Sequence, residues 1–429
     1  MAGKGTVSDY VTLQRGITYK GSLVGKPGPA LLGLGSIHPG GGFREGDYKT
    51  YGGECPPKLM LFPGDLFVSL KGATKDGKMI GSVARVPPSV PSGRLTQDTV
   101  KLEFCEKNPK TANFLYWILR TPQYRDYCDG RATGSAVVAL SRDDFLDYPV
   151  PPITRLRLSI VELLEALDDK IELNRRMNAT LEAMARALFQ SWFVDFDPVR
   201  AKLDGRQPAG LDEATAALFP AAFQDSPLGE IPHGWQIGTL GELVQLRTDR
   251  VDATPAKDST RYVALEDMPS KSIDLSKFQL GSAVNSSITA FRKGDVLFGS
   301  MRPYFHKVGL AFFDGITRTT TFVLRPRKDC FRHFALLYFF SDDVVAYSTT
   351  ASVGTTIPYV RWDSMESYRI PIPPDPLLAE FEAMVSPLVQ RIAAQGEESR
   401  TLATLRDTLL PKLLSGELSV ANFEKELST

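Results

Sequence analysis

Basic and hydroxyl-bearing side chains gather beside glycines in several stretches of this sequence. Backbone N–H and hydroxyl groups in such loops can bind phosphate, and Arg or Lys can donate hydrogen bonds to the edges of guanine. For any single residue a solvated loop is the better explanation, but the stretches taken together predict contacts with DNA. The candidate DNA-binding residues are Lys71, Lys75, Arg131, Thr133, Ser135, Ser300, Arg302, Tyr304, Lys307, Arg318, Thr319, Ser352 and Thr355.

Signs of other chemistry are scarce. The sequence contains no GxxxxGK[ST] phosphate loop and no GxSxG nucleophile turn, and its glycine-rich stretch 32–42 lacks the third glycine of a dinucleotide fingerprint. The four cysteines form no CxxC pair, and the four histidines show no HExxH spacing. We therefore expect a chain that is not an enzyme, with no catalytic residue, metal or cofactor of its own.

Length and composition indicate a folded protein of several domains. The chain has 429 residues, of which 43% are hydrophobic and 23% charged. No apolar run is long enough to cross a membrane, and unpaired cysteines suit a reducing compartment, so we expect a cytoplasmic location.

The net charge of zero conceals an uneven distribution. Residues 1–150 carry 19 basic and 14 acidic residues, residues 232–374 carry 17 and 14, and the remainder carries 14 and 22. An anionic ligand suits the two basic blocks, whereas a protein partner suits the acidic remainder.

The sequence repeats itself with an offset of about 222 residues. Gly93 matches Gly315, Thr99 matches Thr321, and Pro149-Val-Pro-Pro matches Pro371-Ile-Pro-Pro. Earlier in each copy, Pro-Gly-Asp-Leu-Phe matches Lys-Gly-Asp-Val-Leu-Phe at an offset near 230. Each copy is far longer than the unit of a solenoid, so the pattern predicts a duplicated domain.

A long apolar pattern with alternating spacings of four and three follows each proline pair. This heptad pattern predicts two coiled-coil helices, each of about 40 residues and therefore about 60 Å long. Polar residues interrupt the two seams at matching positions and would meet if the helices pair antiparallel; two ordinary core helices with polar centres are the alternative. The interrupting residues are Asn174, Asn178, Gln395 and Ser399.

These observations predict an α+β fold with two mixed α/β domains related by internal duplication and separated by two long antiparallel coiled-coil helices. The strand-like runs 66–70, 99–104, 296–298 and 320–324 and the buried-helix patterns 113–119 and 334–340 lie in the two domains. The expected divisions are 1–152 for the first domain, 153–195 for the central helix, 196–231 for a linker, 232–374 for the second domain, 375–418 for the C-terminal helix and 419–429 for a tail.

The order of domain, long helix, domain and long helix resembles the specificity subunit of type I restriction–modification enzymes. Residues 167–189 and 191–202 look like the central helical region of that family, and residues 409–418 look like the end of its second helix. Gly294-Asp-Val-Leu-Phe-Gly-Ser-Met-Arg-Pro-Tyr is similar to a recurrent stretch of its target-recognition domains.

The resemblance implies a non-catalytic subunit that reads a bipartite, asymmetric DNA site, with one half-site for each domain. It also implies two methylation subunits docked on the helices and restriction subunits that translocate DNA. S-adenosylmethionine, ATP and Mg²⁺ are then expected on those partners rather than on this chain.

One departure separates the two domains. The first copy reads Ser69-Leu-Lys-Gly where the second reads Ser300-Met-Arg-Pro-Tyr, which predicts different half-sites. The alternative to the whole interpretation is a coiled-coil scaffold whose globular ends bind proteins or other ligands.

Overall fold

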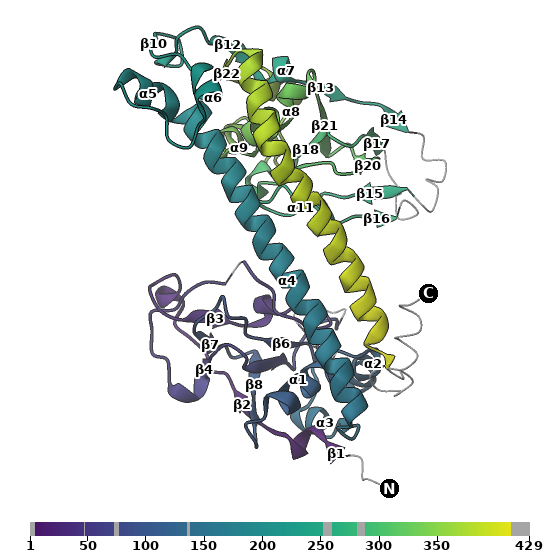
Figure 1. Cartoon of the computed structure of the whole chain (residues 1–429). Helices are drawn as coiled ribbons and strands as arrows, with labels where there is room; N and C mark the ends of the chain where they lie inside the picture. The colour runs from purple at the N-terminus through teal and green to yellow at the C-terminus, as the bar shows by residue number, and fades with distance from the viewer. Residues whose placement is uncertain are drawn as a thin grey trace. The chain divides into compact units, whose positions relative to one another are not determined.

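The computed structural model describes residues 5–46, 48–72, 77–134, 138–251, 260–280 and 288–412 (Figure 1). The chain divides into two compact units, one made of residues 1–169 and 403–429 and the other of residues 170–402, so that both divisions fall inside the long helices. Among the described residues, no helix combines the length and apolar character needed to cross a membrane.

The described residues of the first unit contain a four-stranded sheet, a three-stranded sheet and a two-stranded sheet. The four-stranded antiparallel sheet has the order β2 (Val11–Arg15), β8 (Thr99–Phe104), β5 (Leu66–Ser69) and β6 (Val83–Arg85). The three-stranded sheet has the order β3 (Ala30–Leu32), β7 (Gly93–Leu95) and β4 (Met60–Leu61), and β1 (Gly5–Thr6) pairs separately with β9 (Pro149–Val150).

Among the described residues, three α-helices between β8 and β9 accompany these sheets, and each begins at a side-chain cap. They are α1 (Pro109–Ile118), α2 (Pro122–Arg131) and α3 (Arg142–Leu146). The side chains of Asn108, Thr121 and Ser141 accept hydrogen bonds from the first-turn N–H groups of α1, α2 and α3, respectively. Such caps satisfy backbone donors that have no partner inside the helix, which explains where the helices begin.

The second unit repeats this arrangement. Its antiparallel sheet has the order β13 (Val244–Arg247), β21 (Thr321–Pro326), β18 (Val296–Gly299) and β19 (Val308–Leu310). A five-stranded sheet has the order β14 (Arg250–Val251), β17 (Ile288–Phe291), β20 (Gly315–Arg318), β15 (Arg261–Val263) and β16 (Gln279–Leu280). The other elements are α5 (Asp197–Leu203), α6 (Glu213–Ala217), β10 (Phe223–Gln224), β11 (Ile231–Pro232), β12 (Gln236–Thr239), α7 (Leu240–Leu243), α8 (Arg332–Phe340), α9 (Asp342–Thr350), α10 (Trp362–Glu366) and β22 (Arg369–Ile372).

Strand register confirms the predicted duplication. Leu13 opposes Leu102 in the first antiparallel sheet, and Leu246 opposes Leu324 at the equivalent place in the second. The other sheet of each unit contains one parallel pair, β3 with β7 in the first and β15 with β20 in the second. The predicted strands and the two predicted buried helices are also present, as β5, β8, β18, β21, α1 and α8.

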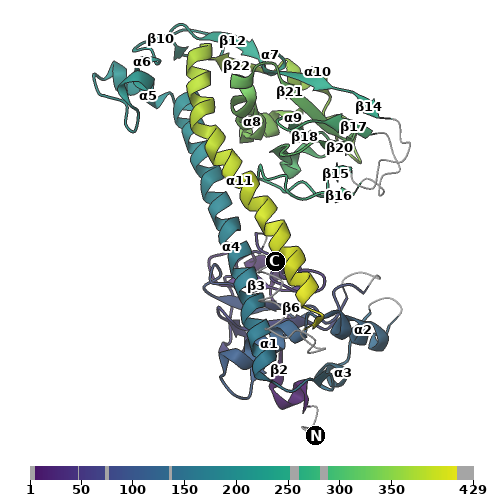
Figure 2. The same ribbon diagram turned by 45° about the vertical axis from the view of Figure 1, so that its right-hand side comes forward.

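The two predicted long helices are α4 (Arg155–Phe189) and α11 (Asp375–Leu409), each 35 residues long. In α4 the helix passes directly into a π-helical turn, η5 (Gln190–Val194). At 1.5 Å per residue, each α-helix is about 52 Å long. Within residues 170–402 the two run side by side in both views (Figures 1 and 2).

The seam between the two helices is antiparallel, as predicted. Asn174 Nδ2 donates to Ser399 Oγ at 3.2 Å and to Glu398 Oε2 at 2.8 Å. Asn178 Nδ2 donates to the carbonyl oxygen of Ile392 at 3.3 Å, so a later residue of α4 contacts an earlier residue of α11. The polar residues that interrupt both heptad patterns therefore meet in part, which favours a fixed register.

One hydrophobic core joins the second domain to both helices. It includes Phe189 from α4, Phe193 from η5, Phe334 from α8 and Phe381 from α11. The ring centroids of Phe193 and Phe334 are 4.8 Å apart, as are those of Phe193 and Phe381. This packing fixes the second domain on the helices that carry it.

Candidate nucleic-acid interface

The hairpin loop between β18 and β19 forms the centre of the candidate interface in the second domain. The two strands pair antiparallel, so residues 300–307 form the loop that connects them. Within it, η7 (Pro303–Phe305) is a short 3-10 turn, and the flanking residues Arg302 and His306 have φ angles of 48° and 51°. Left-handed backbone is uncommon outside glycine, so the surrounding structure must hold this loop in its shape.

His306 anchors the loop to the interior of the second domain. Its side chain is buried, and its Nε2 atom donates to the carbonyl oxygen of Phe340 at 2.8 Å. Its Nδ1 atom lies 3.5 Å from the carboxylate of Asp342. Burial lowers the pKa of His306, so the imidazole is neutral near pH 7. Opposite the anchor, the N–H of Arg302 donates to the carbonyl oxygen of Pro358 at 2.7 Å.

The structure brings three predicted stretches of the second domain together. Antiparallel bridges join Met301 to Tyr359 and Val353 to Tyr359. The N–H of Ser300 donates to the carbonyl oxygen of Thr320 at 2.9 Å. The stretches around residues 300, 320 and 355 therefore form one continuous surface feature.

Several predicted residues of the second domain reach solvent. Arg302, Tyr304, Thr319 and Thr355 are exposed. Tyr304 shows 50% of its surface, which is unusual for an aromatic residue and leaves its ring available to a partner.

Other predicted residues have internal roles. Ser300 Oγ donates to Thr320 O at 2.8 Å, and Ser352 Oγ donates to Ser348 O at 2.8 Å. Lys307 Nζ donates to Leu265 O at 2.6 Å, and burial lowers the pKa of this lysine. Arg318 is half-buried, and its Nε has no hydrogen-bond partner within the described part of the chain. The side chains of Ser300, Ser352 and Lys307 hold the loops in place, which argues against direct contacts between these three residues and DNA.

The first domain presents fewer free cations. Lys71 lies 3.7 Å from Asp98, and Arg131 lies 3.4 Å from Asp144, with its guanidinium 4.0 Å from the ring centroid of Tyr127. Thr133 is exposed. Lys75 and Ser135 lie outside the described residues.

Equivalent bridges place the loops of both domains at the same position. Lys71 and Thr133 both bridge to Ala139, as Met301 and Val353 both bridge to Tyr359. The residues that follow Lys71 and Met301 also make equivalent hydrogen bonds. The N–H of Gly72 donates to the carbonyl oxygen of Val138, and the N–H of Arg302 donates to that of Pro358. Gly72 is therefore the counterpart of Arg302, so the expected alignment of Lys71 with Arg302 is shifted by one residue.

Comparison with known proteins agrees with this architecture. A family model described as the type I restriction modification DNA specificity domain matches residues 232–379. The chain is 25% identical over 332 residues to the type I restriction enzyme MjaIX specificity subunit of Methanocaldococcus jannaschii, covering 73% of this chain and 71% of that protein. It is 24% identical to the HindI specificity subunit of Haemophilus influenzae, covering 62% and 68%.

The chain belongs to the family of type I restriction–modification specificity subunits.

The fold of this specificity subunit also matches a solved structure. The crystal structure of a type I restriction–modification S subunit from M. genitalium has a TM-score of 0.53 and 16% sequence identity, covering 96% of this chain and 95% of that one. At this identity, the likeness concerns the fold alone.

Sequence reasoning missed part of the exposed surface of the second domain. Phe305, Val353, Ile357 and Tyr359 show between 40% and 47% of their surface, and Arg361 is also exposed. Hydrophobic residues are assigned to the core by default, so their exposure could not be foreseen from the pattern. The pair Tyr304-Phe305 after a proline was the one available signal, because adjacent aromatic residues in a turn cannot both point inward.

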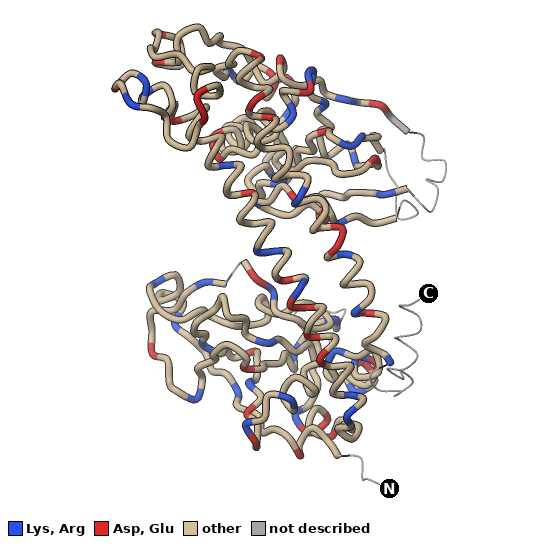
Figure 3. Tube along the Cα trace, viewed as in Figure 1, with Lys and Arg blue, Asp and Glu red and all other residues tan. Residues whose placement is uncertain are grey.

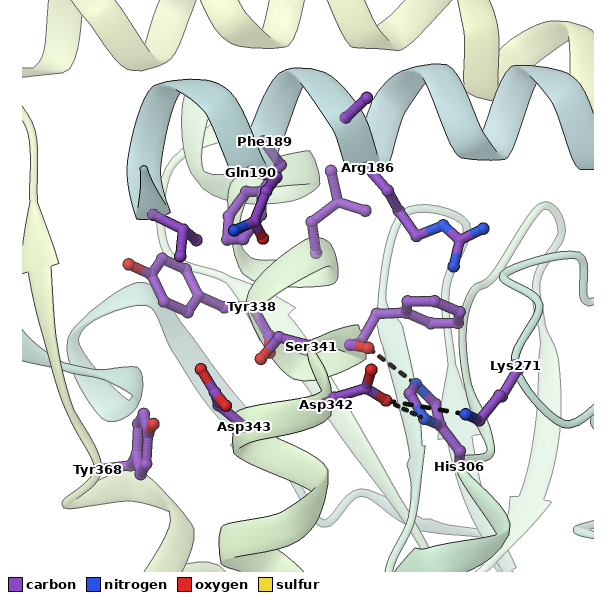
Figure 4. A pocket seen from close by; sticks show the side chains of 14 residues that line it. Arg186, Phe189, Gln190, Lys271, His306, Tyr338, Ser341, Asp342, Asp343 and Tyr368 are labelled. Atoms are coloured by element: carbon purple, nitrogen blue, oxygen red, sulfur yellow. Dashed lines mark hydrogen bonds and ion pairs between the residues drawn. The ribbon is translucent and has the colours of Figure 1, made fainter. Parts of the chain in front are cut away.

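A cavity of about 540 Å³ lies behind the hairpin loop (Figure 4). Arg186 and Gln190 line it from α4 and η5, and Lys271, His306 and Asp342 line it from the second domain. The N–H of Lys271 donates to the carbonyl oxygen of His306 at 2.9 Å, and its Nζ lies 3.9 Å from the carboxylate of Asp342. In the described residues, no group of three His, Cys, Asp or Glu could hold a metal ion. The contacts of Lys271 and Asp342 with His306 show that the walls of the cavity support the hairpin loop.

Proposed function

We propose that this specificity subunit reads a bipartite, asymmetric DNA site, with one half-site for each of its domains. The supporting observation is that the two domains hold equivalent loops in the same register but fill them with different side chains. Gly72 in the first domain corresponds to Arg302 in the second, and Lys71 corresponds to Met301. A shared scaffold with different loop chemistry suits two different sequences in the major groove.

The long helices are proposed to dock two methylation subunits. The sequence suggested acidic helices, but this holds for α11 alone, which carries three basic and six acidic residues. In contrast, α4 carries six of each, and Figure 3 shows both signs along its length. Exposed Leu173 and Met184 lie 11 residues apart on α4 and hence on nearly the same face. Docking on α4 is therefore expected to combine apolar contact with mixed charge.

The same helices are proposed to set the spacer between the half-sites, because the lengths of α4 and α11 are fixed by their heptad seams. Methylation subunits would bind S-adenosylmethionine and flip the target adenine, and restriction subunits would supply translocation with ATP and Mg²⁺. The chain itself would be non-catalytic and would act in the cytoplasm, where it meets host and incoming DNA.

Selection from a random DNA library tests this function. The full chain is purified with the methylation subunits of its system, and bound duplexes are sequenced. We expect enrichment of one motif with two unlike half-sequences and a fixed unspecified spacer. A library that stays unenriched while the subunits co-purify would contradict DNA reading and favour a protein-binding scaffold.

A further inference from the structure

Two neighbouring aromatic residues project from the second domain. Tyr304 and Phe305 show 50% and 44% of their surface, and their ring centroids are 4.8 Å apart at an interplanar angle of 60°. Exposed aromatic side chains lose the free energy that burial would provide, and a cluster of them marks an interaction site.

The turn that carries this pair is held firmly. The N–H of Phe305 donates to the carbonyl oxygen of Arg302 at 2.9 Å, and the N–H of His306 donates to that of Pro303 at 2.8 Å. Arg302 and His306 adopt left-handed backbone, which costs about 1 kcal/mol or more for each residue. The buried His306 side chain, bonded to Phe340 O, offsets that strain. The aromatic pair is therefore presented by a preorganised turn.

The two segments that carry and flank the pair are cationic, and outside them the exposed carboxylate of Asp342 lies 3.5 Å from the Nδ1 atom of His306. Segments 300–307 and 351–361 contain Arg302, Lys307 and Arg361 and no acidic residue. Arg302 and Arg361 are exposed, and neither forms an ion pair within the described residues. A duplex in which one base step is unstacked complements this combination, because its phosphates suit the exposed guanidinium groups and the opened base faces suit the half-exposed rings.

We propose that Tyr304 and Phe305 insert as a wedge into the second half-site and hold one base step open; this inference rests on the proposed DNA-reading function. Side-chain wedges unstack base steps and kink the duplex. An adenine must leave the stack before it can be methylated, so a base step that is already open lowers the cost of flipping the adjacent base. Arg361 holds a flanking phosphate while the rings enter, and Arg302 reads a neighbouring base edge.

In the described part of the first domain, the residue that anchors the turn in the second domain has no equivalent side chain. The N–H of Ser69 donates to the carbonyl oxygen of Ser82, as the N–H of Gly299 donates to that of Lys307 in the second domain. The residue before each acceptor is therefore equivalent, so Gly81, with φ of 70°, occupies the position of His306. A Cβ at Gly81 would lie 2.5 Å from Cys128 Sγ and 2.8 Å from the hydroxyl oxygen of Tyr124. No side chain like that of His306 fits there, so the inference concerns one half-site.

The test uses 2-aminopurine, which fluoresces when it is unstacked. The full chain, in complex with its methylation subunits, binds duplexes that carry the split site. The probe replaces, in turn, each base beside the methylated adenine. We expect wild-type fluorescence to rise at one step of the second half-site. Tyr304→Ala and Phe305→Ala should suppress that rise and slow methylation of the second half-site by roughly 5- to 150-fold, the range expected for one base–aromatic stack.

Matched variants separate stacking from loss of structure. Phe62→Ala removes an aromatic side chain that is 52% exposed in the first domain, and it should leave both half-sites unchanged. Phe305→Trp should retain the fluorescence rise. The wedge would be overturned if the two alanine variants gave the same fluorescence rise as the wild type. It would also be overturned if these variants bound the methylation subunits more weakly in the absence of DNA, because the loss would then come from assembly and not from stacking. If the wild-type complex selects no split site, the proposed function itself fails.

Discussion

Replacing Gly396 with alanine tests how the second domain is fixed to the helices. Gly396 lies inside α11, where a loop of the second domain crosses it. A Cβ at this position would lie 1.8 Å from Ser276 Oγ and 2.7 Å from Ser276 Cβ. Because the second of these atoms is attached directly to the backbone, the loop must move.

The contacts at risk can be counted from the structure. Ser272 Oγ and the N–H of Ile273 both donate to Glu182 Oε2 at 3.0 Å, and Asn178 Nδ2 donates to Asp274 Oδ2 at 3.3 Å. Hydrogen bonds to charged groups contribute about 1.5–3 kcal/mol each, whereas Gly→Ala in a helix gains about 1 kcal/mol. Loosening two of the three therefore leaves a net loss of roughly 2–5 kcal/mol.

Urea unfolding of the full chain and hydrogen exchange at the Ile273 amide measure this loss. Gly396→Ala should lower the free energy of unfolding of the second unit and speed exchange at Ile273. Adding Ser276→Gly removes the atoms in conflict and should restore part of the stability, so the double-mutant cycle is non-additive. A gain of about 1 kcal/mol from Gly396→Ala alone would show that the loop does not press on α11, because helix propensity would then be the whole effect.

Three further predictions follow from the site and the helices. Burial lowers the pKa of His306 below its ordinary value of about 6.5, so its contribution to stability is complete above that pH and is lost as the pH falls. Between about pH 7.5 and pH 5.5, the wild-type protein should therefore lose more free energy of unfolding than the His306→Gln variant. Equal losses would contradict a buried neutral imidazole. Arg302→Ala should weaken binding to the second half-site by about 1–3 kcal/mol and spare the first, and loss confined to the first half-site on methylation mapping would contradict the placing of Arg302 at the second half-site. Lys307→Ala should instead lower the melting temperature, because the ammonium group of Lys307 donates to the carbonyl oxygen of Leu265. Inserting seven residues into both α4 and α11 should change the spacer and preserve both half-sequences, and altered half-sequences would contradict the role of the helices as a ruler.

The sequence predicted the elements whose signals are local. Heptad spacing and the proline pairs predicted α4 and α11, and short apolar runs predicted β5 and β18. It did not predict the loop that docks on the helices, because that contact joins segments distant in sequence. Glu182 reads as a surface charge on α4, yet it is 5% exposed because Ser272 and Ile273 donate to it. Burial also raises the pKa of Glu182, a consequence that only the tertiary structure reveals.

The candidate interface was predictable as a set of loops but less so residue by residue. The polar and basic loops of the second domain do come together, since glycine and hydroxyl residues mark turns. Ser300 and Lys307 nevertheless bond carbonyl oxygens of Thr320 and Leu265, and nothing in a sequence identifies such partners. The exposed ring of Phe305 was missed for the opposite reason, because an aromatic residue is assumed to be buried.

Single-molecule sequencing of host DNA for methyladenine, with and without this gene, tests DNA reading most directly. Deletion is expected to remove one split, asymmetric methylated motif, and restoring the gene is expected to return it. If the restored gene carries Arg302→Ala, the fraction of methylated adenine should fall at the second half-sequence only. A methylome that is unchanged by deletion, although the chain still co-purifies with methylation subunits, would contradict the assignment of sequence recognition to this chain.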